Sequence, residues 1–162
     1  MVRSRPRQFI PLVARLRNLR PDVPDPARAI SAGEVLAEGR VVTNLERTNV
    51  ADLDDRLVPA EVEVVTMDLS YLPVALAAPQ LEQVRIHPCA DLIALVKPMY
   101  ELGRRTAPHS RADLGEACRR AADGVEATGW SVDRVDGVIP SPVPGARGAH
   151  EFLLHARRRP SP

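Results

Sequence analysis

The sequence is poor in lysine, aromatic residues and cysteine. Of its 22 lysine and arginine residues only Lys97 is a lysine, and aromatic residues make up 3% of the 162 residues. A core with so few aromatic rings must be built from alanine, valine and leucine. The two cysteines, Cys89 and Cys118, are widely separated in sequence, which indicates neither a disulfide framework nor a zinc site.

Long apolar runs are also absent. No run approaches the length of a membrane span, and arginines interrupt the N-terminal apolar stretch too often for a signal peptide. We therefore expect a cytoplasmic protein with no membrane partner. The net charge of +1 hides an asymmetry, because residues 1–21 carry six arginines and no acidic residue. Such a segment is typical of a local binding surface for phosphate groups, although it can also be no more than a solvated helix face.

The N-terminal quarter predicts a small α+β unit. Residues 7–19 place apolar side chains at helical spacing with arginines on the remaining face. Residues 34–44 predict two short strands around a turn at Glu38 and Gly39.

The rest of the chain alternates strands and helices. Strands are predicted at 62–70, 90–97, 131–143 and within 145–157, and helices at 51–57, 72–84 (with a break at Pro79) and 111–130. Alternation of helices with continuous apolar strands favours an α/β fold with a parallel sheet. The last two strands have no helix between them, so we expect them to pair as an antiparallel hairpin.

Three ionisable residues stand where strands of this sheet begin or end. Asp68 ends one predicted strand, Lys97 ends the next, and Glu151 starts the final strand, which runs the opposite way. In open α/β sheets ligands bind at the carboxyl ends of the strands, so we expect the three side chains on one rim. Singly, each fits an ordinary cap, turn or solvated position. Together they favour a catalytic site, where a lysine can donate or accept a proton and an arginine cannot.

Several motifs occur in a familiar order. They are "LERTN" (45–49), "VVTMDLSY" (64–71), "LIALVKPMYELG" (92–103), "ATGW" (127–130) and "PSPVPGARGAHEFLLHAR" (140–157). Over residues 41–158 the chain resembles the TlyA (hemolysin-like) family of ribosomal RNA ribose methyltransferases, within the FtsJ-like superfamily. "ISAGEVLAEGRVVTN" (30–44) resembles the S4-type RNA-binding module that precedes the methyltransferase in that family.

This resemblance implies a domain organisation and a partner. Residues 45–158 would form the C-terminal half of a Rossmann-like methyltransferase sheet, residues 1–44 an S4-like α+β module, and residues 159–162 a disordered tail. The partner would be RNA, either ribosomal RNA or ribosomal subunits. Within the module, the resemblance and the basic charge together point to four RNA-binding arginines: Arg15, Arg17, Arg20 and Arg28.

The resemblance also implies an activity, the transfer of a methyl group from S-adenosylmethionine (SAM) to a ribose 2′-hydroxyl. The superfamily uses a Lys-Asp-Lys-Glu tetrad, of which Asp68, Lys97 and Glu151 match the last three members. Asp68 would also contact SAM. In this chemistry Lys97 would accept the hydroxyl proton or hydrogen-bond the developing alkoxide, and electrostatic stabilisation is the role we favour.

Parts of the family pattern are absent. The chain has no second lysine for the tetrad, no glycine cluster after a strand between residues 40 and 68, and no acidic residue at the end of a further strand for the SAM ribose. We attribute this to an in-frame deletion or a misjoined gene model between Asn44 and Leu45, and expect weak or no SAM binding. The alternative to an enzyme is a non-catalytic RNA-binding remnant. Loss of the first strand would expose an edge of strand 62–70, through which two chains could pair as a homodimer.

Overall fold

The computed structural model of the chain describes residues 36–37, 40–41, 43, 45, 47–133 and 136–159. It divides into two units, residues 1–48 and 49–162, which are described separately. In the first unit, β1 (Leu36–Ala37) pairs antiparallel with β2 (Arg40–Val41), which confirms the predicted pair of short strands. The predicted helix at 7–19 and the four arginines expected to bind RNA lie outside the described residues, as does the tail beyond Arg159.

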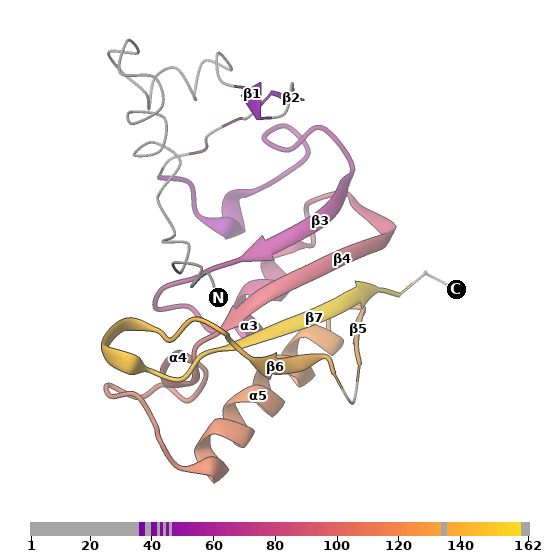
Figure 1. Cartoon of the computed structure of the whole chain (residues 1–162). Coiled ribbons are helices and arrows are strands. Elements are labelled where there is room, and N and C mark those ends of the chain that lie inside the picture. Colours follow the sequence, from indigo (N-terminus) through magenta and orange to yellow (C-terminus); the bar gives the residue numbers. More distant parts are fainter. Residues whose placement is uncertain are drawn as a thin grey trace, which may run out of the picture. The chain divides into compact units, whose positions relative to one another are not determined.

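The second unit contains the sheet shown in Figure 1, in the order β3-β4-β7-β5. Its strands are β3 (Val62–Met67), β4 (Ile86–Val96), β5 (Trp130–Val132) and β7 (Phe152–Arg158), while β6 (Val138–Pro140) also pairs with β7. β3 and β4 are parallel, and β7 is antiparallel to each of its partners. The fold is therefore mixed α/β with an open sheet. We expected a parallel sheet, but β3 and β4 are the one parallel pair among the described strands.

Two strand predictions need correction. The strand predicted at 131–143 is split into β5 and β6, because a turn intervenes in which Gly137 N–H donates to the Asp133 carbonyl (3.1 Å). The strand predicted within 145–157 begins only at Phe152, since a 3-10 turn, η3 (Ala146–Gly148), precedes it. The predicted antiparallel pairing of the last two strands is confirmed by β6 and β7.

Each predicted helix is shorter in the structure, and the helix predicted at 111–130 ends at Glu126. α5 (Arg111–Glu126) begins at Ser110, whose Oγ accepts a hydrogen bond from Asp113 N–H, the usual N-cap arrangement. The helix predicted at 72–84 is found as α3 (Val74–Ala77) followed by the 3-10 helix η2 (Ala78–Leu81), so the break at Pro79 is confirmed. The helix predicted at 51–57 is wrong: only a 3-10 turn forms there, η1 (Val50–Asp52), capped by the Asn49 side chain.

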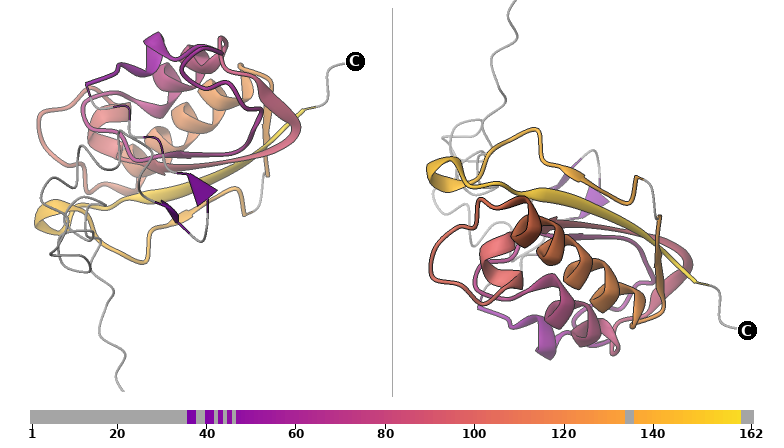
Figure 2. Two further views of the ribbon diagram at one scale, coloured as in Figure 1. Left: turned by 90° about the horizontal axis from the view of Figure 1, so that it is seen from above. Right: turned by 90° about the horizontal axis from the view of Figure 1, so that it is seen from below.

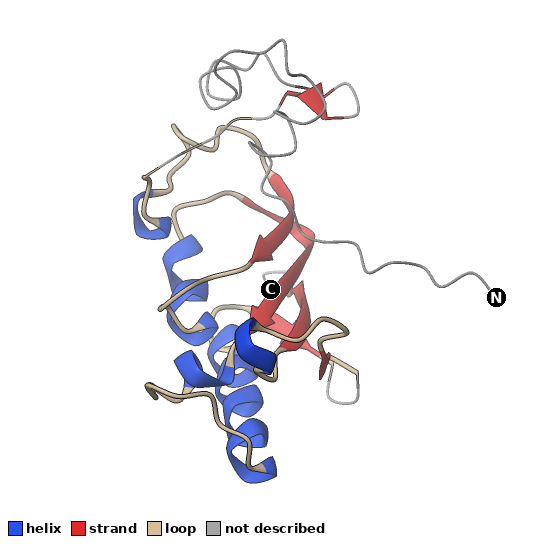
Figure 3. Cartoon of the chain, turned by 60° about the vertical axis from the view of Figure 1, so that its left-hand side comes forward, coloured by secondary structure: helices blue, strands red, loops and turns tan. Residues whose placement is uncertain are grey.

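The helices of this unit gather on one face of the sheet (Figures 2 and 3). Alternate residues of β4 face them and are fully buried, namely Ala90, Leu92, Ala94 and Val96. Small side chains on the strands let α5 pack close to the sheet. On the opposite face Val64 and Ile93 remain 56% and 41% exposed, respectively.

β3 is the outermost strand of this sheet among the described residues. Its outer edge lies on the side where the sequence predicted a missing strand.

In the part of the chain that the structure describes, no helix combines the length and the apolar character that crossing a bilayer demands.

Candidate active site

Asp68 and Lys97 meet at the carboxyl edge of the two parallel strands. The register pairs Met67 of β3 with Ala94 of β4, so both strands end at the same edge. Lys97 Nζ donates to Asp68 Oδ1 over 2.6 Å. The Lys97 side chain is only 19% exposed, whereas that of Asp68 is 70% exposed. The ammonium is thus sheltered, while the carboxylate that holds it stays open to solvent.

Glu151 joins this pair from the antiparallel strand. It precedes β7, whose Phe152 is paired with Val96, and therefore lies beside Lys97. Partial burial raises the pKa of Glu151, the nearby Asp68 carboxylate raises it further, and the Lys97 ammonium opposes the shift. The structure thus brings together the three ionisable residues that the sequence placed on one rim.

Gly145 is required for the position of Glu151. A Cβ atom at residue 145 would lie 2.3 Å from Glu151 Oε1 and 2.6 Å from its Cδ. The loop that carries Glu151 is closed by two backbone hydrogen bonds, from Ser141 N–H to the Glu151 carbonyl (2.8 Å) and from Gly145 N–H to the Ala149 carbonyl (2.9 Å). Any larger residue at 145 would displace the carboxylate.

The segments that follow β3 and β4, residues 68–74 and 97–101, contact each other at two further points. We call them the paired loops. The rings of Tyr71 and Tyr100 pack at 5.7 Å between centroids and 44° between planes. Beyond them, Val74 N–H at the start of α3 donates to Glu101 Oε1 in α4 (Pro98–Glu101) over 2.6 Å. These contacts fix the position of Asp68 relative to Lys97.

Glu101 is a structural carboxylate that the sequence did not reveal. It is 7% exposed, and its Oε2 has no hydrogen-bond partner. Burial raises the pKa of Glu101, and hydrogen bonds from the Val74 and Ala75 amides partly offset this. In the sequence it follows Tyr100 as an ordinary polar residue, so no local signal could have identified it.

A pocket of about 760 Å³ opens beside Lys97. Its walls come from the paired loops, from residues 105–109 after α4 and from residues 145–151, and we call it the Lys97 pocket. Arg105 and Arg147 line it, together with His109 and His150, whose rings meet edge to face at 6.0 Å. These four residues could not be identified from the sequence, because nothing in their spacing links the two segments. Cations and imidazoles therefore line the same pocket as the Asp68, Lys97 and Glu151 side chains.

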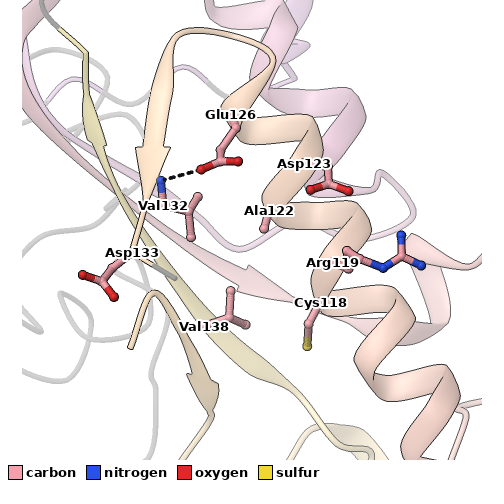
Figure 4. Close-up of a pocket in the computed structure, with 8 residues that line it drawn as sticks. All are labelled: Cys118, Arg119, Ala122, Asp123, Glu126, Val132, Asp133 and Val138. Carbon is pink, nitrogen blue, oxygen red and sulfur yellow. Dashed lines mark hydrogen bonds between the residues drawn. The ribbon is translucent and has the colours of Figure 1, made fainter. Parts of the chain in front are cut away.

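A second, smaller pocket of about 210 Å³ lies between α5 and strands β5 and β6 (Figure 4). Cys118 lines it, and Glu126 Oε1 accepts a 3.4 Å hydrogen bond from Val132 N–H at its edge. Burial, with a smaller contribution from the Glu101 carboxylate, raises the pKa of Cys118 to about 11. The thiol is protonated at neutral pH, so this pocket holds no activated cysteine nucleophile.

The open mixed sheet, with ionisable residues at the ends of its parallel strands, defines an α/β protein with a site at the sheet edge. Two solved structures share the fold, both of proteins described as hemolysins. The one from Streptococcus thermophilus has a TM-score of 0.66 and 24% identity over 75% of this chain and 45% of the other. The one from Lactococcus lactis has a TM-score of 0.57 and 23% identity over 75% and 58%.

Sequence comparison gives the family. Over 127 residues the chain is 35% identical to the 16S/23S rRNA (cytidine-2′-O)-methyltransferase TlyA of Mycobacterium tuberculosis, in the H37Rv and CDC 1551 strains alike. The match covers 73% of this chain and 44% of the relative, so the chain spans less than half the length of the curated relatives it matches. No profile of a protein family matches the sequence. The chain belongs to the TlyA, hemolysin-like family.

Proposed function

We propose that this chain carries the acceptor side of an RNA ribose 2′-O-methyltransferase site, with Asp68, Lys97 and Glu151 as its catalytic residues. The observation that supports this most strongly is the 2.6 Å contact between Lys97 Nζ and Asp68 Oδ1 beside Glu151, since these are the residues that match the family tetrad. The curated relative is described as acting on the 2′-oxygen of cytidine in 16S and 23S rRNA, which makes ribosomal RNA the proposed substrate.

The chemistry asks for a group that stabilises a developing alkoxide. A ribose hydroxyl is a weak nucleophile and loses its proton as it attacks a methyl group. Lys97, held in place by Asp68, can donate a hydrogen bond to the ribose oxygen as negative charge builds up on it. Glu151 is our candidate for receiving the proton, because a carboxylate whose pKa is raised by burial is a better base than an ordinary one.

S-adenosylmethionine is the methyl donor that the family implies, and the described residues do not form a complete site for it. Residues 40–102 contain no glycine, so among the described strands neither β2 nor β3 is followed by a glycine loop that could approach a ligand closely. β3 is also the outermost strand of the described sheet, and Asp68 at its end would touch only the margin of a donor. We therefore expect weak or no SAM binding by this chain alone.

RNA is the proposed partner on electrostatic grounds as well. Arg105 and Arg147 line the Lys97 pocket and are both exposed, as phosphate-binding residues must be. Arg15, Arg17, Arg20 and Arg28 would supply further RNA contacts in an S4-like module. With an rRNA substrate the protein would act in the cytoplasm. We also propose that two chains pair as a homodimer through the outer edge of β3, the outermost strand of the described sheet.

Methyl transfer to ribosomal subunits tests the proposal. The full chain is incubated with 30S and 50S subunits and methyl-labelled SAM at high concentration, and ribose methylation is measured in the digested rRNA. The catalytic proposal predicts label with the wild type, at a low level because SAM binds weakly, and none with Lys97→Met. If the wild type and Lys97→Met give the same background label in the rRNA, the catalytic proposal is overturned. RNA binding without transfer then identifies a non-catalytic RNA-binding remnant.

Two further measurements test the missing part of the site. Isothermal titration with SAM is expected to give no saturation in the micromolar range, and micromolar binding would refute the expectation of an incomplete donor site. Sequencing of the gene around Asn44 and Leu45 distinguishes a real deletion from a misjoined coding sequence.

A further inference from the structure

Most of the arginines described beyond residue 48 have a partner. They contact a carboxylate or a backbone carbonyl oxygen, as Arg104 does when it donates to both oxygens of Asp113. Arg105, Arg111 and Arg147 differ, because none of them has a hydrogen-bond or ion-pair partner among the described residues. Their guanidinium groups therefore keep all five N–H donors available for a ligand.

Two of these three arginines line the same pocket. Arg105 lies in the segment after α4, Arg147 lies in the loop before β7, and both line the Lys97 pocket. The two segments meet in the contact between the His109 and His150 rings, whose centroids are 6.0 Å apart at an interplanar angle of 76°. This contact holds both arginines on walls of one cavity.

The positive charge of these walls is not compensated within the pocket. Residues 105–109 and 145–150 contain no acidic residue. The acidic residues that line the pocket are Asp68 and Glu151, and both interact with Lys97. An anion is therefore the ligand whose charge complements the walls that carry Arg105 and Arg147.

The backbone of Arg147 is held in place before any ligand arrives. Its turn is closed by two hydrogen bonds, from Gly145 N–H to the Ala149 carbonyl (2.9 Å) and from Gly148 N–H to the Gly145 carbonyl (3.1 Å). The φ angle of Arg147 is 57°, in the left-handed region that costs a non-glycine residue free energy. Its side chain is nevertheless exposed, and strain without burial occurs preferentially at functional sites. A fixed backbone also loses less entropy when a ligand binds.

The proposed reaction brings an anion into this pocket. The 2′- and 3′-oxygens of a ribose are attached to neighbouring carbon atoms, and in an RNA chain the 3′-oxygen carries a phosphodiester. A ribose whose 2′-oxygen meets Lys97 therefore brings its own 3′-phosphate close to the same site. Arginine suits this group, because its planar fork donates two parallel hydrogen bonds to phosphate oxygens.

We propose that Arg105 and Arg147 bind the phosphodiester on the 3′ side of the substrate ribose and so hold its 2′-oxygen at Lys97. The inference rests on the proposed function for the identity of the reacting oxygen. The phosphate contact itself can be measured without methyl transfer.

Two isomeric nucleotides test the position of the phosphate. Cytidine 3′-monophosphate and cytidine 5′-monophosphate share base, sugar and, at pH 8, charge, and they differ in the carbon atom that carries the phosphate. Their affinities for the full chain are measured without SAM by isothermal titration at about 0.1 M salt, where exposed charges are only partly screened. We expect the wild type to bind the 3′ isomer about 3- to 30-fold more tightly than the 5′ isomer.

A double variant and a matched control locate the contact. Replacing both arginines, Arg105→Gln with Arg147→Gln, is expected to make the two affinities equal. Arg111→Gln is the control, because Arg111 also lacks a partner among the described residues but does not line the Lys97 pocket. It is expected to keep the wild-type preference. No described residue contacts any of the three guanidinium groups, so all variants should melt at the wild-type temperature.

Several results would overturn the inference. It fails if the wild type binds both isomers equally or binds neither of them. It also fails if the double variant keeps the preference, or if Arg111→Gln loses the preference to the same extent as the double variant.

The outcome is separable from that of the proposed function. If ribosomal subunits are not methylated but the double variant loses the preference for the 3′ isomer, the proposed function fails and the phosphate site stands. If methylation occurs and the double variant keeps both this preference and the wild-type KM for ribosomal subunits, the phosphate site fails and the function stands.

Discussion

Two glycines in α5 are expected to respond to the same substitution with opposite signs. Gly115 and Gly124 both lie inside the helix, where alanine is favoured over glycine by about 0.5–1 kcal/mol. A methyl group added at Gly115 meets no atom within 4 Å. Gly115→Ala should therefore stabilise the protein by about 0.5–1 kcal/mol.

A methyl group at Gly124 meets the neighbouring helix. It would lie 2.4 Å from Cβ and 2.6 Å from Cα of Ala75 in α3, so the two helices must move apart. Overpacking of this kind costs about 1–3 kcal/mol, which exceeds the gain in helix propensity. Gly124→Ala should accordingly destabilise the protein by about 1–2 kcal/mol. The two variants should then differ by roughly 2 kcal/mol.

Urea unfolding followed by the fluorescence of Trp130 measures both variants. Trp130 is the only tryptophan and is 1% exposed, so its emission reports the unfolding of the sheet. Differences of 1 kcal/mol are resolved by the midpoint when the slope is unchanged. Equal free energies of unfolding for the two variants, or a Gly124→Ala variant more stable than the wild type, would refute the close α3–α5 packing.

Further predictions concern Glu101, Gly145, the cysteines and the sheet edge. Burial raises the folded-state pKa of Glu101, so just above pH 4.5 the folded state binds more protons than the unfolded chain, and stability falls as pH rises through that window. Glu101→Gln should remove this pH dependence of the free energy of unfolding in urea melts. Glu101→Leu should instead cost about 1–3 kcal/mol, because it leaves the buried Val74 amide unpaired. Gly145→Ala should displace the Glu151 carboxylate and reduce rRNA methylation. Gly148→Ser is the comparison for backbone strain in the same loop, because Gly148 has a φ of 76° and a Cβ added there meets no atom within 4 Å. Iodoacetamide at pH 8 should alkylate the exposed Cys89 much faster than the half-buried Cys118, whose pKa is raised to about 11, and equal rates for the two thiols would contradict this shift. Val64→Lys on β3 should lower any self-association seen by sedimentation, and an unchanged dimer would exclude pairing through this strand.

The sequence predicted the meeting of three charged side chains on one rim better than it predicted the sheet. Asp68, Lys97 and Glu151 were identified because strand ends are marked by a change from apolar to charged residues, and the topology then places such ends on one edge. The split between β5 and β6 was missed because Val135 continues the apolar pattern of the sequence between Val132 and Val138, where Gly137 is the only glycine. Strand order depends on contacts between residues far apart in sequence, and a local pattern does not encode it.

Contacts that carry no local signature were also missed. The Val74–Glu101 hydrogen bond and the edge-to-face contact of His109 with His150 join segments 27 and 41 residues apart, respectively. Tyr71 belongs to the motif at residues 64–71, but its positive φ and its exposure are tertiary properties. The family resemblance is the basis of the proposed reaction, which neither composition nor periodicity provides.

The paired loops impose a strict limit on how the site can vary. Asp68 with Lys97, then Tyr71 with Tyr100, follow each other at the same three-residue spacing on both sides. A single residue inserted into either segment would shift every later side chain of that segment away from its contact in the other segment. Relatives and engineered variants that keep the chemistry should therefore change both segments together in length or not at all, whereas side chains between the contacts are free to diverge.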